Sequence, residues 1–325
     1  MNSKPITQRS GKKPKLIVDI AVSVSAKRIA IARSNREVEL WSESGELIAK
    51  HRQHKQKIES VYISPCGSSV ISIGKPKRSR QARATPDIFN ESWGVPAALD
   101  CREVYYWQPS SDALRYFDPF TRLEDVYGVA FVPNSDSVAY DANALCFHDP
   151  ADQDEKSRLY DREVGRIAAS RSGKLIAVGL DGGGIAIWNR ETNTEAIKYK
   201  SHSSEIDGIA FSEDDQFLGS TSEDGSLCIT NLADGSLIRR VDAPCKELFH
   251  FGYIDSNRSW AVVSRDHGIQ VFGHSTERDY QAEIPTIRDL VAAKLSPDGS
   301  KLVTANLNGH VTIHVTSQLS RAVAC

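Results

Sequence analysis

Histidine pairs are the first residues to consider for metal or catalytic chemistry. His51 and His54 lie three residues apart in the segment HRQH, and His310 and His314 lie four residues apart. A structural zinc site needs four ligands, usually cysteine and histidine, and no cysteine lies near the first pair. We expect His51 and His54 to be solvated or to form structural hydrogen bonds, and His314 to pack where other repeats carry an aromatic residue. The sequence therefore predicts no metal site.

Two further segments have compositions that occur in ligand-binding loops. The acidic segment from Asp149 to Glu155 lacks the glycine and the terminal glutamate of an EF-hand calcium loop, so we expect a solvated loop there. Glycines 182–184 are followed by no lysine and no predicted helix, which a phosphate-binding loop requires, so we expect a turn. No G-x-S-x-G motif for a serine nucleophile is present. We predict a protein that is not an enzyme and has no cofactor.

The strongest candidate for binding is the segment from Lys75 to Asp100. Its first half, KPKRSRQARATP, is cationic, and its second half, DIFNESWGVPAALD, carries large apolar side chains. Large apolar residues in a long loop either fold back on the protein or contact a partner, and arginine and aromatic residues are favoured as anchors in interfaces. We predict that this segment binds a protein, through an acidic surface of that partner, with Lys75, Lys77, Arg78, Arg80, Arg83, Phe89 and Trp93.

Basic side chains beside aromatic ones also make nucleic acid an alternative partner. Residues 1–15 and 75–86 contain ten of the 40 basic residues and no acidic ones, which leaves 30 basic against 42 acidic residues elsewhere. Basic side chains would neutralise phosphates, and Phe89 or Trp93 would stack on a base. The acidic remainder of the chain would repel a long polyanion. A steep loss of affinity with added salt would identify this alternative.

Seven short apolar strands recur along the chain at a nearly constant interval. Successive ends of these strands lie 66, 40, 41, 42, 42 and 42 residues apart, at Trp41, Trp107, Phe147, Trp188, Thr230, Phe272 and His314. Without an insertion of roughly 25 residues the first interval is about 41 as well. Four strand-like runs per repeat of this length are typical of a propeller blade. The sequence therefore predicts an all-β fold, a seven-bladed β-propeller of four-stranded antiparallel blades.

The fifth repeat shows the strand pattern most clearly, and the third repeat matches it least. The Asp224-Gly225 and Asp234-Gly235 pairs provide the positive φ angles that tight turns require. An isolated sheet of this kind leaves apolar faces uncovered, so stacking in a ring stabilises it. The predicted strands of this repeat are Ile206–Ser212, Gln216–Ser222, Ser226–Thr230 and Leu237–Val241.

These residues resemble the WD40-repeat family. The likeness rests on Asp-Gly turns before the third strand, tryptophans that end it, histidines that precede the next first strand, and one Ser-Pro-Asp-Gly turn; the residues are Asp181, Asp224, Trp41, Trp107, Trp188, His54, His202 and Ser296 to Gly299. In the family, a His, an Asp, a Ser or Thr and a Trp form a buried hydrogen-bonded set. The fifth repeat has His202, Asp224 and Ser220 or Ser222 but Thr230 in place of Trp, so the chain resembles a divergent member.

The resemblance implies a non-enzymatic scaffold that binds proteins through loops on one face, as a subunit of a larger complex. The second alternative is a propeller enzyme whose active site gathers His and carboxylate groups at the mouth of the central channel. We expect residues 1–15 to be a basic tail and residues 16–325 to form the propeller, with the insertion at about 75–100 in its second blade. We also expect Arg321 to Cys325, rather than Pro5 to Gln8, to complete the last blade.

Composition sets the remaining expectations. The chain has 325 residues, 40% of them hydrophobic and 25% charged, as is usual for globular proteins. No apolar stretch follows the basic N-terminus and none reaches 18 residues, so we expect no secretory signal and no membrane association. Its six cysteines are widely spread and should be reduced. We therefore expect a cytoplasmic, monomeric propeller that acts within a complex.

Overall fold

The regular secondary structure of the described residues is β-strand, apart from two short 3-10 turns. The computed structural model describes residues 16–23, 27–75, 102–111, 113–116, 128–135, 137–141, 145–149, 152–156, 164–242, 248–254, 258–265, 267–273, 279–282 and 289–318. These residues form antiparallel sheets of three or four strands, an all-β architecture that fits a β-propeller. Among them, no helix has the length and apolar character needed to cross a membrane.

The first three sheets lie within residues 17–156, and each has four strands in hydrogen-bonded sequence order. The first contains β1 (Ile17–Ser23), β2 (Arg28–Arg33), β3 (Val38–Ser42) and β4 (Leu47–His51). The second contains β5 (Ile58–Ile63), β6 (Val70–Gly74), β7 (Val104–Gln108) and β8 (Ala113–Tyr116). The third contains β9 (Val129–Phe131), β10 (Val138–Asp141), β11 (Leu145–Asp149) and β12 (Asp152–Lys156).

The remaining sheets continue the same order, with two short 3-10 turns, η3 (Asp181–Gly183) and η7 (Thr316–Gln318). The fourth sheet contains β13 (Val164–Ala169), β14 (Leu175–Leu180), β15 (Gly184–Asn189) and β16 (Thr194–Lys200). The fifth contains β17 (Ile206–Phe211), β18 (Phe217–Ser222), β19 (Ser226–Asn231) and β20 (Leu237–Asp242). The sixth contains β21 (Leu248–Ile254), β22 (Ser259–Ser264), β23 (Gly268–Phe272) and β24 (Tyr280–Ala282). In the seventh, β25 (Leu290–Leu295), β26 (Lys301–Asn306) and β27 (Val311–Val315) are described.

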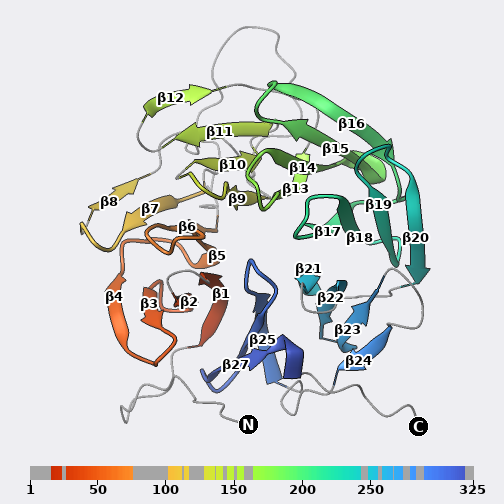
Figure 1. Ribbon diagram of the computed structural model, residues 1–325. Coiled ribbons are helices and arrows are strands. Elements are labelled where there is room, and N and C mark those ends of the chain that lie inside the picture. The colour runs from red at the N-terminus through yellow and green to blue at the C-terminus, as the bar shows by residue number, and fades with distance from the viewer. Residues whose placement is uncertain are drawn as a thin grey trace, which may run out of the picture.

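The sheets stand around a common centre, with the first strand of each sheet innermost (Figure 1). The strand β1 contacts β5 on one side and β25 on the other, so the first and last sheets are neighbours. The strands β4, β16 and β20 lie at the periphery (Figure 1). Outer strands are correspondingly exposed: Leu237 and Ile238 of β20 are exposed, whereas β18 is buried along most of its length.

The hydrophobic core is divided among the interfaces between neighbouring sheets. One buried cluster joins Ile29 of the first sheet to Val303 of the seventh, and another joins Leu40 of the first sheet to Val61 of the second. A third joins Ile229 of the fifth sheet to Trp260 of the sixth. Because each sheet buries its two faces against its neighbours, the fold is stabilised by stacking of sheets rather than by a single central core.

A β-bulge follows the first residue of most inner strands. The register shifts between Ile17 and Asp19 in β1, and equivalent shifts occur in β5, β13, β17, β21 and β25. A bulge changes the direction of the following side chains and increases strand twist. The bulges lie at one side of the molecule, where the inner strands begin, and we call this side the entry face.

The strands predicted for the fifth repeat agree with β17 to β20 to within one residue at each end. The third repeat, which matches the pattern least well, also forms four strands. The predicted loop from Asp149 to Glu155 is wrong, because β12 begins at Asp152 and pairs with β11. An acidic composition therefore does not prevent backbone pairing in this strand. Residues 1–15 and 319–325, and with them the proposed tail and closing strand, lie outside the described residues.

Candidate binding surface

The root of the insertion lies on the entry face. Lys75 follows β6 and is exposed, and its backbone N–H donates a hydrogen bond to the carbonyl oxygen of Lys57 at 2.7 Å. Lys57 belongs to the loop that leads into β5, so the insertion starts beside that loop. The other predicted anchors, Lys77, Arg78, Arg80, Arg83, Phe89 and Trp93, lie outside the described residues, and their binding role stays a prediction.

The residues that follow the insertion, Arg102 and Glu103, are held to the same loop through their side chains. The Glu103 carboxylate accepts the backbone N–H groups of Lys55 and Gln56 at 2.8 and 2.9 Å. The neighbouring Arg102 guanidinium forms an ion pair with Glu59 at the start of β5. Hydrogen bonds to a carboxylate are stronger than those between neutral groups. Both ends of the insertion are therefore fixed to the loop that enters the second sheet.

The same position in the fifth sheet carries the opposite charge. There the backbone N–H of Glu223 donates to the carbonyl oxygen of Glu205 at 3.1 Å, as Lys75 does to Lys57 in the second sheet. All four side chains are exposed. Asp207 lies beside the two glutamates, and burial together with the Glu223 and Glu205 charges raises its pKa. The entry face is therefore basic at the second sheet and acidic at the fifth.

A buried hydrogen-bonded set fixes the entry face of the fifth sheet. The Nε2 atom of His202 lies 2.8 Å from the Ser220 hydroxyl, and its Nδ1 lies 3.3 Å from the Asp224 carboxylate. The Ser226 hydroxyl, which donates to Asp224, lies 3.0 Å from Nδ1. Because the Asp224 carboxylate can only accept hydrogen bonds, Nδ1–H is the donor on that side of the ring, and Nε2 accepts the hydroxyl hydrogen of Ser220. Burial lowers the pKa of His202, while Asp224 opposes that shift, so the ring is neutral at pH 7. Of the two serines proposed from the sequence, Ser220 is the one that contacts His202.

Asp224 makes the largest number of contacts in this set. Its carboxylate also accepts the backbone N–H groups of Ser203 at 2.9 Å and Ser226 at 3.0 Å, and it pairs with Arg240 at 3.1 Å. Burial alone would raise the pKa of Asp224, but the hydrogen bonds from Ser226 and Ser203 outweigh burial and hold it well below its usual range. The carboxylate is therefore ionised and joins the loop before β17 to the turn before β19.

Replacing Asp224 with alanine is expected to lower the free energy of unfolding by about 2 to 3 kcal/mol, because His202 and two backbone N–H groups lose their acceptor. Urea denaturation followed by circular dichroism measures this change. Asp181 occupies the equivalent turn of the fourth sheet but is exposed, so Asp181→Ala is the matched control and should cost less than about 0.5 kcal/mol. Equal losses in the two variants would show that the buried set contributes nothing.

The second sheet contains a related set that uses a different acid. The Nε2 atom of His54 lies 2.8 Å from the Ser72 hydroxyl, and its Nδ1 lies 3.6 Å from the Glu103 carboxylate. The ring of His51 packs edge-on against Trp107, with centroids 4.7 Å apart. Burial lowers the pKa of His51 to about 4. A solvated His51 is therefore a wrong expectation, since its ring lies in the contact between the first and second sheets.

The three tryptophans of the repeat pattern have different surroundings. Trp107 and Trp188 are buried at the ends of β7 and β15. Trp41 is also buried, and its indole N–H donates to the Glu39 carboxylate at 2.9 Å. The Arg33 guanidinium donates to the same carboxylate at 2.8 Å. The first sheet thus contains a buried Arg–Glu–Trp arrangement, which the repeat pattern gave no reason to expect.

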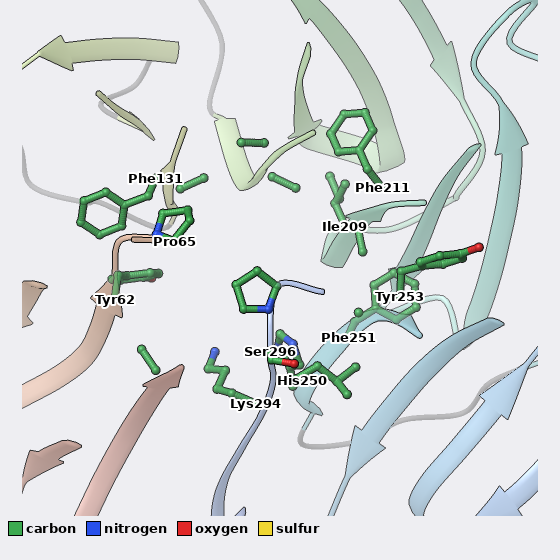
Figure 2. Close-up of a pocket in the computed structure, with 18 of the residues that line it drawn as sticks. Tyr62, Pro65, Phe131, Ile209, Phe211, His250, Phe251, Tyr253, Lys294 and Ser296 are labelled. Atoms are coloured by element: carbon green, nitrogen blue, oxygen red, sulfur yellow. The ribbon is translucent and has the colours of Figure 1, made fainter. Parts of the chain in front are cut away.

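A cavity of about 1040 Å³ lies at the centre, between the inner strands (Figure 2). Its apolar wall includes Phe131, Phe211 and Phe251, and the Lys294 side chain extends into it from β25 (Figure 2). Within the described part of the chain, no group of three His, Cys, Asp or Glu side chains is arranged to hold a metal ion. The cavity therefore combines an apolar wall with a few separate polar groups.

Comparison with known families adds one match. Residues 193–231 match the WD40 family, described as WD domain, G-beta repeat. The matched segment covers one repeat and runs from the turn before β16 to the end of β19, so it includes His202, Ser220 and Asp224. No curated protein matches the chain. WD40 repeats are in general protein-interaction modules and typically not enzymes. The buried His–Ser–Asp set lies within the matched segment, and one detected repeat supports a WD40-repeat assignment.

Proposed function

We propose that this protein is a seven-bladed propeller that binds a protein partner on its entry face, at the second blade. The ring arrangement is supported by contacts between successive inner strands, from β1 through β5, β9, β13, β17 and β21 to β25, which contacts β1 again. A rigid ring presents loops of different blades in fixed relative positions. Little conformational entropy is therefore lost when those loops bind.

The observation that carries the proposal is the charge difference across the entry face. Lys57 and Lys75 lie at the second blade, next to the exposed Lys55, and Glu205 and Glu223 occupy the equivalent positions of the fifth blade. The basic side continues into a segment rich in lysine, arginine and aromatic residues. Complementary charge increases the association rate and specifies orientation. We therefore expect the partner to place an acidic surface against the second blade. We expect it to make no contact with the acidic positions of the fifth blade.

The insertion is the part of this surface that can be removed with least effect on the fold. The strands β6 and β7 pair from Val70–Trp107 to Ile73–Val104, so the sheet continues across the insertion's two ends. We expect a variant without residues 76–99 to unfold at the same urea concentration as the full chain and to lose its partner. Affinity purification of both tagged proteins from the native host, followed by mass spectrometry, measures this. Equal recovery of every co-purifying protein would contradict the proposal.

The same purification distinguishes a protein partner from nucleic acid. Several lysine–phosphate contacts would make binding fall steeply between low and physiological salt. We expect the co-purifying protein to remain after nuclease treatment and at physiological salt. Loss of all bound material on nuclease treatment would replace the protein partner with nucleic acid and leave the role of the insertion in place.

A further inference from the structure

The central cavity has a regular wall that is interrupted at two positions. Each inner strand contributes one residue at the same level of the cavity wall: the fifth residue of six strands, and the second residue of the short strand β9. Five of these seven residues are alanine or glycine; the set is Ala21, Tyr62, Ala130, Ala168, Ala210, Gly252 and Lys294. Small side chains at this level keep the space open. The two large side chains, Tyr62 and Lys294, are both polar at their ends. At these equivalent positions of the inner strands, only Tyr62 and Lys294 place large side chains in the cavity.

Lys294 brings an ammonium group into this space without a close partner. No hydrogen bond or ion pair involves its Nζ atom within the described part of the chain. Asp19 in β1 lies close enough for its charge to interact with Lys294, and its carboxylate accepts the backbone N–H of Val61 at 2.9 Å. A partly buried ammonium group with unused donors favours an anion supplied from outside.

Other polar groups around Lys294 are suited to donate hydrogen bonds. Burial and the Asp19 charge raise the pKa of Tyr62, so its hydroxyl keeps its proton at neutral pH. Burial and the Lys294 charge lower the pKa of His250, so its imidazole stays neutral and has one N–H to donate. Both residues line the cavity with Lys294 (Figure 2). An anion bound there would meet one positive charge and two neutral donors.

Two of the three acidic residues that line the cavity, Glu213 and Asp298, have close partners. Glu213 forms an ion pair with Arg171, and Asp298 accepts the Ser296 hydroxyl and the backbone N–H of Ser300 at 2.6 and 3.0 Å. At the entry-face end, Arg166 lies close enough to Asp207 to oppose the rise in its pKa. Glu213 and Asp298 are therefore compensated locally, whereas the ammonium donors of Lys294 have no hydrogen-bond partner among the described residues.

The rest of the wall suits an apolar body. Ile209, Phe211 and Phe251 line one side and Phe131 lines the other (Figure 2). Ligand pockets usually measure about 300 to 1,000 Å³ and combine a mostly apolar lining with a few polar groups that fix orientation. The cavity of about 1040 Å³ is at the upper end of that range. An apolar or aromatic group can lie against this wall while a charged end reaches Lys294.

We propose that the central cavity binds a small organic anion, with its acidic group on the Lys294 ammonium and its apolar body against Phe131, Ile209, Phe211 and Phe251. Carboxylate, sulfonate and phosphate groups share the required chemistry. This site lies inside the ring and is separate from the protein-binding surface at the second blade. It does not depend on the partner proposed for that surface.

Fluorescence titration with 8-anilinonaphthalene-1-sulfonate tests the site, because this probe combines an aromatic body with a sulfonate. We expect one probe molecule per native chain, and an affinity about 10- to 100-fold lower for Lys294→Met, since a hydrogen bond to a charged group is lost. Lys294→Arg should retain most of the affinity. Ala210→Phe, which narrows the cavity beside Ile209 and Phe211 without altering Lys294, should also weaken binding.

Two controls make the outcome decisive. Lys174→Met removes an exposed lysine that pairs with Glu191 on the outside of the fourth blade, and it should leave the affinity unchanged. Urea denaturation of each variant shows that the native state is intact during the titration. The proposal is overturned if Lys294→Met binds the probe as the native chain does, or if decanoate and acetate at equal concentration displace the probe equally well. The second result would show that the apolar wall makes no contribution.

Discussion

Replacing Trp260 with alanine is expected to lower the free energy of unfolding by about 4 kcal/mol, because a fully buried aromatic side chain leaves a cavity that the surrounding residues only partly fill. Trp260 lies in β22 and is completely buried. Its indole packs over Gly219 of β18, in the neighbouring sheet: a Cβ atom at position 219 would lie 2.3 Å from the Trp260 Nε1 atom. Urea denaturation at pH 7 measures the change.

Two companion variants test the reason given for this loss. Leu237→Ala removes an apolar side chain that is 51% exposed on β20, and it should change stability by less than about 0.5 kcal/mol. Gly219→Val should destabilise the protein, since its side chain would occupy the space of the Trp260 indole. A Trp260→Ala variant as stable as Leu237→Ala would contradict the view that stacking between sheets stabilises the ring.

Acidification from pH 7 to pH 4.5 is expected to lower the free energy of unfolding by at least about 2 kcal/mol through His51 and His54 alone. Burial lowers the pKa of His51 to about 4, and burial lowers that of His54 despite the opposing charge of Glu103. In the unfolded chain both histidines bind protons below about pH 6.5. The unfolded state therefore binds more protons between pH 6.5 and pH 4, and stability falls as pH falls through that range.

Urea denaturation at several pH values, repeated on His51→Phe, measures the contribution of this ring. Within the described part of the chain, neither ring nitrogen of His51 has a hydrogen-bond partner, so phenylalanine can occupy the site without leaving a polar group unpaired. The variant should show a shallower loss of stability with acid. His310→Phe, at an exposed position, should keep the slope of the native chain. An unchanged slope in His51→Phe would show that His51 does not titrate as its burial implies.

The repeat and its strands could be predicted because they depend on local signals. Turn pairs such as Asp224-Gly225 and the alternation of apolar residues specify strand ends within a few positions. The His202 set was predictable for the same reason, since its members come from the short segment between residues 202 and 226. Glu103, the equivalent acid in the second blade, could not be predicted in this way. The insertion separates it from Ser72 in the sequence, and no Asp-Gly turn marks its position.

The central cavity could not be predicted from any single segment. Lys294 and Tyr62 are ordinary residues in their own strands, and only the register of the inner strands shows that the other positions at their level are alanine or glycine. The charge difference across the entry face depends on register as well, since Lys57 and Glu205 become equivalent only through matching backbone hydrogen bonds. Aligning the first strands of the repeats position by position would have indicated both.

The affinity of the co-purifying partner for two charge-reversed variants tests the proposed binding surface most directly. The combined change Lys57→Glu and Lys75→Glu alters the second blade, and Glu205→Lys with Glu223→Lys alters the equivalent exposed positions of the fifth. We expect the first variant to bind at least about 10-fold more weakly and the second to bind within about 2-fold of the native chain. Equal affinities of the two variants, or a larger loss in the second, would contradict binding at the second blade.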